Sequence, residues 1–278
     1  MTTSTALAPS RDRRSSPVAD SLTMLRRRLV HMRRYPSLTL MLIGQPIVFL
    51  LLFVYVFGGT MGAGLAGPGA GRAEYLAYIT PAILLMTVAS VALATALGVA
   101  TDMTEGIVAR FRTMAIARVS VLTGHVVGAF VQTAIALVVV LAVALLLGFR
   151  TVAGPVAWLG VFGVLALLTI ALTWFTVALG LAADSVETAS NTPMFLILLP
   201  FLGSGFVPTE SMPTGLRWFA DYQPFTPVID TLRGLLSIGP AATTGLAGSA
   251  ALTVGWCVLI TGASYLWAKR LYNARADR

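Results

Sequence analysis

Six long apolar stretches, separated by short polar or glycine-rich segments, dominate the pattern of the chain. At roughly 20 residues each they suit helices that cross a bilayer. We expect spans at about 37–57, 75–100, 119–148, 155–181, 190–207 and 244–268. The predicted fold class is therefore an all-α integral membrane protein, with six transmembrane helices in one membrane domain over residues 36–268.

The fifth run, 190–207, is interrupted by Pro193, Pro200 and two glycines. Interior prolines cost a helix in water about 3 kcal/mol each, but neighbours in a membrane bundle can satisfy the freed carbonyls. We expect a bent helix with a partly re-entrant outer segment after it. The next stretch, Pro208–Ile238, mixes aromatic and charged residues. This composition is typical of the membrane–water interface, here on the outer face of the membrane.

A glycine-rich segment with seven glycines between Gly58 and Gly71 follows the first run. A Walker-type phosphate loop needs a lysine after its second glycine. The only lysine of the chain, Lys269, follows Ala268, so this motif is excluded. We interpret the glycines as a flexible external loop.

The two ends of the chain are polar. Residues 1–18 have the composition of a disordered cytoplasmic tail, and residues 269–278 form a second, short tail. Between the first tail and Pro36, residues 19–35 predict an amphipathic interfacial helix, because one apolar stripe is formed by Leu22, Leu25, Leu29 and Met32. A solvated linker helix is the alternative for this segment.

Charge is scarce and unevenly placed. The chain is 57% hydrophobic and 11% charged, with a mean hydropathy of +0.85, whereas soluble proteins carry roughly 25% charged residues. Of nineteen basic residues, eight precede Pro36, three lie in Thr101–Arg118 and four follow Ala268. This distribution follows the positive-inside rule and predicts cytoplasmic termini. It also explains the net charge of +8 without a nucleic-acid partner.

The six runs contain no Asp, Glu, Lys or Arg. Ion-coupled carriers usually keep an ionisable residue at membrane depth, so this pattern counts against a carrier. His125, near the inner end of the third run, is interpreted as a hydrogen-bonded helix-end residue, with a proton relay as the alternative. Ser204 lacks the G-x-S-x-G context of a hydrolase nucleophile. We expect no catalytic residue and no metal site, and we expect Cys257 to be a small buried hydrophobe.

The segment Thr101–Arg118, between the second and third runs, has the pattern of a short amphipathic helix. Asp102 and Glu105 have capping-box-like spacing. One face is apolar and the last turns are basic, as the helix dipole favours; the apolar face comprises Met103, Ile107, Phe111 and Met114. Such a helix either closes the loop at the headgroups or docks into a groove of another protein.

The sequence E-G-x-x-x-R-F-R, formed by Glu105, Gly106, Arg110, Phe111 and Arg112, resembles the cytoplasmic coupling-helix signature of type-2 ABC export permeases. The likeness is greatest to daunorubicin/doxorubicin-resistance-type permeases of actinobacteria. It covers residues 20–270 and includes the blocks at 118–124 and 206–236. Ala115 and Gln223 depart from the proline and asparagine that are common in the family. The E-A-A pattern of importers is missing, which implies export.

The resemblance implies a bacterial inner-membrane permease with both termini cytoplasmic, working as two permease chains, identical or sister, with two separate ATPase subunits. ATP and Mg would be bound by the ATPase, so the chain itself would hold no cofactor and would not be an enzyme. The implied substrate is a hydrophobic drug, antibiotic or lipid-like compound moving along spans one, two and five. An ion-coupled secondary carrier and a membrane scaffold or assembly protein remain the alternatives.

Two groups of residues receive roles from this resemblance. The ATPase-coupling group comprises Asp102, Met103, Glu105, Gly106, Ile107, Arg110, Phe111 and Arg112. The outer-gate group comprises Phe206, Pro208, Trp218, Phe219, Tyr222 and Phe225.

Overall fold

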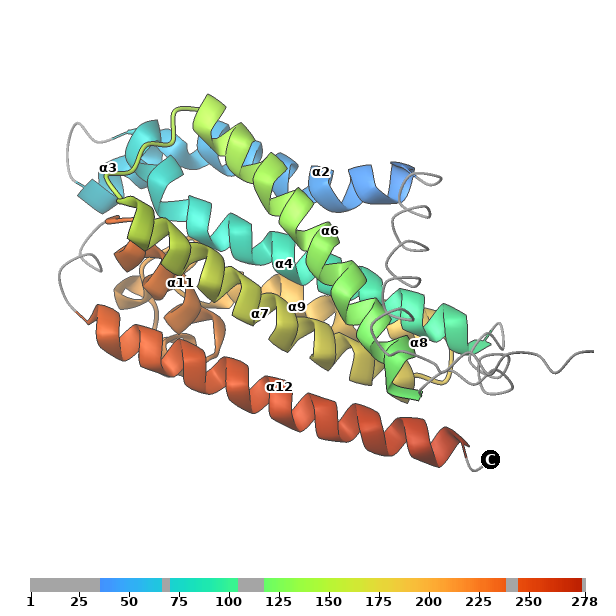
Figure 1. Cartoon of the computed structure of the whole chain (residues 1–278). Coiled ribbons are helices and arrows are strands. Elements are labelled where there is room, and N and C mark those ends of the chain that lie inside the picture. The colour runs from blue at the N-terminus through green and yellow to red at the C-terminus, as the bar shows by residue number, and fades with distance from the viewer. Residues whose placement is uncertain (1–35, 67–70, 105–117, 239–244, 277–278) are drawn as a thin grey trace, which may run out of the picture.

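The computed structural model describes residues 36–66, 71–104, 118–238 and 245–276 (Figure 1). Within these ranges the regular elements are helices, and no strand occurs among them. The all-α fold class is confirmed. The predicted tail 1–18 and the predicted interfacial helix 19–35 lie outside the described residues.

Five helices in the described part of the chain are long and apolar enough to cross a membrane. The first consists of α2 (Pro36–Leu52), the π-helical turn η1 (Phe53–Phe57) and α3 (Gly58–Ala66). The others are α4 (Arg72–Thr104), α6 (Arg118–Leu146), α7 (Pro155–Ala182) and α12 (Leu246–Ala276). They correspond to the first four predicted spans and the sixth.

The fifth apolar run is a chain of short helices. It consists of α8 (Val186–Asn191), η2 (Thr192–Met194), α9 (Phe195–Leu198) and η3 (Leu199–Leu202). Pro193 and Pro200 lie in the two 3₁₀ segments, so the predicted interruption by proline is confirmed. Regular structure ends at Leu202 rather than at residue 207, and the six-span count stays a prediction.

Three short helices lie between the fifth run and α12 in the described residues. They are η4 (Thr209–Ser211), α10 (Thr214–Tyr222) and α11 (Phe225–Leu235). In Figure 1, α11 and α3 lie at one end of the bundle and α8 lies at the other. Following the topology predicted from the sequence, we call the first of these the outer end and the second the inner end.

The prediction of a flexible glycine loop is wrong for Gly58–Ala66, which forms α3. A Cβ atom on Gly62 would collide with the carbonyl group of Gly71, and one on Gly58 would lie 3.1 Å from the Arg72 side chain. Glycine therefore allows α3 to pack directly against the start of α4. The Glu74 carboxylate accepts a 2.7 Å hydrogen bond from the Gly71 amide, which fixes Gly71 at the start of α4.

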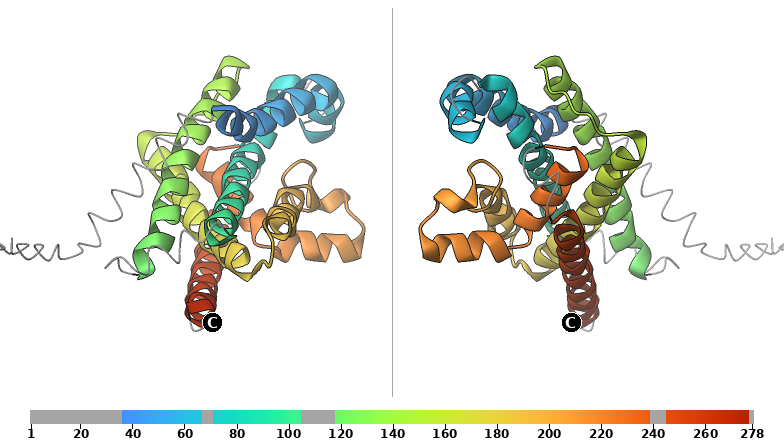
Figure 2. Two further views of the ribbon diagram at one scale, coloured as in Figure 1. Left: turned by 90° about the vertical axis from the view of Figure 1, so that its right-hand side faces the viewer. Right: turned by 90° about the vertical axis from the view of Figure 1, so that its left-hand side faces the viewer.

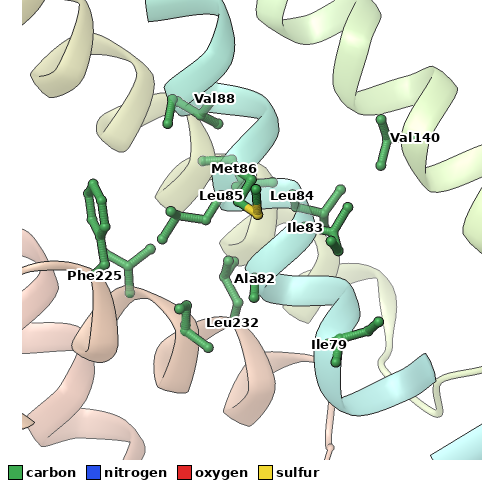
Figure 3. Close-up of a cluster of buried hydrophobic side chains, with 14 of the residues drawn as sticks. Ile79, Ala82, Ile83, Leu84, Leu85, Met86, Val88, Val140, Phe225 and Leu232 are labelled. Carbon is green, nitrogen blue, oxygen red and sulfur yellow. The ribbon is translucent and has the colours of Figure 1, made fainter. Parts of the chain in front are cut away.

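Helix α4 is the centre of the bundle. In its most apolar stretch 78% of the residues are buried, against 17% in the first helix and 11% in α12. Its neighbours are α2, α3, α6, α7, α8 and α11, and α12 packs on the outside of α7 (Figures 1 and 2). Figure 3 shows part of the core that results, with Ile83 of α4 between Val140 of α6 and Leu232 of α11, and Ile79 one turn away on α4.

Close helix contacts also use small residues. A Cβ atom on Gly180 of α7 would lie 2.6 Å from the Ala96 carbonyl oxygen of α4. Membrane helices associate by this kind of tight packing because lipid tails are as apolar as the side chains. Cys257 is buried in α12, as expected of a small hydrophobe.

Candidate functional site at the break in the fifth apolar run

The chain loses regular helical structure at residues 203–206, directly after η3, although these residues are buried. Buried carbonyl and amide groups outside a helix need partners from elsewhere, since an unpaired polar group costs about as much as a lost hydrogen bond. The partners of this break come from the outer part of α4 and from α11.

Arg233 of α11 supplies most of the donors. Its Nη2 donates to the carbonyl oxygens of Ser204 at 2.6 Å and Gly205 at 3.1 Å. Both Nε and Nη2 donate to the Tyr78 carbonyl at 3.2 Å, and Nη1 donates to Oδ1 of Asp230 at 3.2 Å. The residue is only 4% exposed. A guanidinium group fits this task because it offers five N–H donors in a fixed plane.

Four further side chains complete the contacts. The Tyr78 hydroxyl donates to the Ser204 carbonyl at 2.9 Å, and the Ser204 hydroxyl donates to Asp230 at 2.9 Å. The Ser204 amide donates to the Thr226 hydroxyl at 3.3 Å, and Gln223 donates to the Leu199 carbonyl at 3.0 Å. We call these residues the outer polar cluster: Tyr78, Ser204, Gln223, Thr226, Asp230 and Arg233.

The charged members of the cluster are paired. Asp230 and Arg233 are one helical turn apart on α11 and form an ion pair at 3.2 Å. Burial raises the pKa of the Asp230 carboxyl, while the nearby Arg233 guanidinium and Ser204 hydroxyl lower it. Removing one partner would leave a buried charge uncompensated, which is far more costly than losing an exposed ion pair.

Two glycines allow the break to fit this space. A Cβ atom on Gly205 would lie 2.6 Å from the Pro200 carbonyl oxygen, and one on Gly203 would collide with the side chains of Gln223 and Thr226. At Gly205 the chain therefore passes too close to a backbone carbonyl for a larger residue, and at Gly203 a larger residue would displace the side chains of Gln223 and Thr226.

An aromatic cluster joins the break to the first helix. The ring of Phe206 stacks on Phe201 with centroids 4.3 Å apart and lies 4.6 Å from the Phe53 ring. Phe53 opens η1, and π-helical turns of this kind are frequent at functional sites. The first and fifth apolar runs thus meet at their outer ends.

The predicted outer-gate residues fall into two groups. Phe206 and Phe225 are buried beside the outer polar cluster, and Pro208 is half-buried. The remaining three lie exposed on α10: Trp218, Phe219 and Tyr222. Figure 2 shows the orange segment that includes α10 on the opposite side of the bundle from α6. The structure does not bring the two groups together, and a gating role stays a prediction for both.

Of the predicted coupling residues, Asp102 and Met103 belong to the described part of the chain. Asp102 lies in the last turns of α4, which continues to Thr104. The capping-box interpretation is therefore wrong, because an N-cap residue precedes the first turn of a helix. Six others lie outside the described residues: Glu105, Gly106, Ile107, Arg110, Phe111 and Arg112.

The inner ends of α4 and α6 are joined by a hydrogen bond. Nε2 of His125 donates to Oδ2 of Asp102 at 3.1 Å, with the two side chains 10% and 18% exposed. The interpretation of His125 as a hydrogen-bonded helix-end residue is confirmed. Met103 is half-buried and packs against a small cluster that includes Val99 and Leu181.

The sequence analysis missed Arg233 and Asp230 as interior residues. The six apolar runs lack charge, but α11 lies outside those runs and brings a guanidinium into the bundle. The break itself was the available signal, because Pro200, Gly203 and Gly205 predict freed carbonyls that need donors. Among the described residues, no three His, Cys, Asp or Glu side chains lie together as metal ligands would.

Comparison with known proteins places this architecture in a family. The family described as ABC-2 type transporter matches residues 20–236. The chain is 29% identical over 230 residues to the daunorubicin resistance ABC transporter permease protein DrrB1 of Streptomyces coeruleorubidus, covering 82% of this chain and 79% of the relative. It is 24% identical over 242 residues to the probable doxorubicin resistance ABC transporter permease protein DrrC of Mycobacterium tuberculosis, covering 87% and 85%. This chain belongs to the ABC-2 type transporter family and is a multi-pass membrane permease subunit.

Proposed function

We propose that the chain is the membrane subunit of an ATP-driven exporter that moves a hydrophobic drug, antibiotic or lipid-like compound out of a bacterial cell. Two permease chains, identical or sister, work in the inner membrane with two copies of a separate ATPase, and both termini lie in the cytoplasm. ATP and Mg bind to the ATPase. The resistance functions in the names of the relatives support this direction and substrate class.

One observation above others supports a mechanism in which motion at the ATPase side is transmitted to the outer end. Helix α4 runs without interruption from Tyr78 in the outer polar cluster to Asp102 at the inner end. The two residues are about 36 Å apart along the axis at 1.5 Å per residue. A displacement applied beside Asp102 therefore acts on the outer break through one buried helix.

The segment after α4 is the proposed entry point for that displacement. Glu105, Arg110 and Arg112 would contact the ATPase, and Ile107 and Phe111 would be the apolar anchors of a short helix in its groove. Asp102 and Met103 would anchor the start of this segment to the bundle through His125 and the cluster around Val99.

An ion-coupled carrier is the weaker proposal. Such a carrier needs an ionisable group that exchanges its ion at membrane depth. Asp230 is the partly buried carboxylate nearest to that description, but Arg233 and Ser204 both donate to it. Its negative charge is therefore already paired within the outer polar cluster rather than available to exchange an ion.

Charge reversal tests the proposal. Arg110→Glu with Arg112→Glu should weaken co-purification of the ATPase in detergent and separate ATP hydrolysis from export in proteoliposomes. The matched control is Arg217→Glu, on the exposed surface of α10, which should leave both measurements unchanged. Intact assembly and transport in the double variant would refute the coupling role.

The energy source is tested separately. Export of a fluorescent hydrophobic drug from vesicles should require ATP and the ATPase, and should persist after an ionophore has collapsed ion gradients. Transport driven by a gradient without any ATPase would identify a carrier. A complex without substrate-stimulated ATP hydrolysis would identify a scaffold.

A further inference from the structure

Arg233 bonds to both α4 and the break, two elements that the hydroxyl groups of Tyr75 and Tyr78 also join. Its guanidinium bonds the Tyr78 carbonyl on α4 and the Ser204 and Gly205 carbonyls in the break. The break itself belongs to no regular helix, so side chains from α4 and α11 are what fix its backbone. No ladder of backbone hydrogen bonds has to be broken for it to move.

The hydrogen bonds of Arg233 fall into two sets with different partners. The bonds to Asp230 and to Tyr78 keep the guanidinium in place from two sides, since it lies 3.6 Å over the Tyr78 ring. The hydrogen bonds from Arg233 to the Ser204 and Gly205 carbonyls connect the guanidinium to the break alone. A shift of α4 relative to the break can therefore exchange the second pair of bonds while the charge of Arg233 stays paired with Asp230.

We propose that Arg233 is the positioning residue of the outer end: it holds residues 203–206 against α4 in the resting permease and releases their carbonyls during each transport cycle. The release step rests on the proposed function, because ATP hydrolysis by the partner must drive it through α4. The holding step rests on the geometry alone.

The test uses a cysteine reporter in the break. Ser204 is 6% exposed, and Ser204→Cys leaves its backbone carbonyl unchanged. Cys257, the only native cysteine, is replaced in the same chain by alanine. The protein, with its co-purifying ATPase, is reconstituted in proteoliposomes, and a membrane-impermeant maleimide is added at the outer face. Ser211→Cys, on an exposed residue of η4, is the matched control.

Without nucleotide, Cys at 204 should react slowly in the Arg233 protein and about tenfold faster in Arg233→Gln, as expected when a local opening loses a charge-assisted hydrogen bond. Arg233→Lys keeps the charge beside Asp230 but lacks the planar fork, and should give an intermediate rate. This milder variant serves if the glutamine variant folds poorly. The Ser211→Cys protein should react equally in all backgrounds.

ATP should then raise the rate at position 204 in the Arg233 protein and have little further effect in Arg233→Gln. Equal rates in the Arg233 protein and both variants would overturn the holding role. A rate that rises on substitution but never responds to hydrolysed ATP would show a static structural role and overturn the release. If the complex hydrolyses no ATP, the proposed function fails instead, and the comparison without nucleotide still decides the holding role.

Discussion

The guanidinium of Arg233 lies 3.6 Å from the centre of the Tyr78 ring and also donates to the carbonyl oxygen of the same residue. One residue of α4 thus meets one residue of α11 through its ring face and its backbone at once. The Tyr78 hydroxyl adds a third contact by donating to the Ser204 carbonyl.

These contacts can be separated by substitution. Tyr78→Phe removes only the hydroxyl and should lower the free energy of unfolding in detergent by about 1 kcal/mol. Tyr78→Leu also removes the ring face and should cost about 1–2 kcal/mol more. Tyr55→Phe, on an exposed tyrosine of η1, is the control and should have no effect. Equal losses for phenylalanine and leucine would mean that the ring contributes nothing.

The packing of α3 against the start of α4 depends on the close approach of Gly62 to Gly71. Gly62→Ala places a methyl group against the Gly71 carbonyl and should destabilise the protein by about 1–3 kcal/mol. Gly59 lies in the same helix, and a methyl group there would have no neighbouring atom within 4 Å, so Gly59→Ala should be neutral or stabilising. Thermal unfolding in one detergent compares the two, and equal melting temperatures would contradict the close packing.

The aromatic cluster should contribute more to the free energy of unfolding than exposed rings do elsewhere. Phe206→Ala removes a ring that contacts Phe201 and Phe53 and should cost about 3 kcal/mol or more. Phe162→Ala removes a ring from an exposed position on α7 and should cost much less. The comparison is made by chemical unfolding in micelles, and similar costs would show that the stacking adds no stability.

The bond between Asp102 and His125 should control opening at the inner end. Asp102→Asn replaces a charge-assisted hydrogen bond by a weaker neutral one. A loss of about 1 kcal/mol corresponds to about fivefold faster amide exchange in peptides that cover the ends of α4 and α6. Asp221→Asn, on exposed α10, should leave those peptides unchanged. Unchanged exchange in the Asp102 variant would show that packing alone joins the two helix ends.

Much of the fold could be predicted because hydropathy and helix length are tightly linked in a membrane. The ends of α4 and α7 lie within a few residues of the prediction, and Pro193 and Pro200 interrupt the fifth run as their chemistry requires. The error at Gly58–Ala66 has a physical reason. Glycine is a poor helix former in water, but between packed helices its missing side chain allows close contact.

The candidate site is harder to predict from the sequence than the fold is. Charged residues outside an apolar run normally lie at the surface, and the pattern around Arg233 and Asp230 gives no sign of burial. The guanidinium is buried because the carbonyl groups of residues 203–206 lie outside a helix and need hydrogen-bond donors. The capping prediction at Asp102 fails because its spacing from Glu105 fits a helix start, whereas the preceding helix continues through it.

The enclosure of α4 has a practical consequence for engineering the protein. A helix with 78% of its most apolar stretch buried within its own chain has little surface left for any ligand. Libraries aimed at changing which compounds are accepted should therefore leave α4 intact and randomise the outward-facing positions of α2 and η1, which include Met41, Val48 and Tyr55.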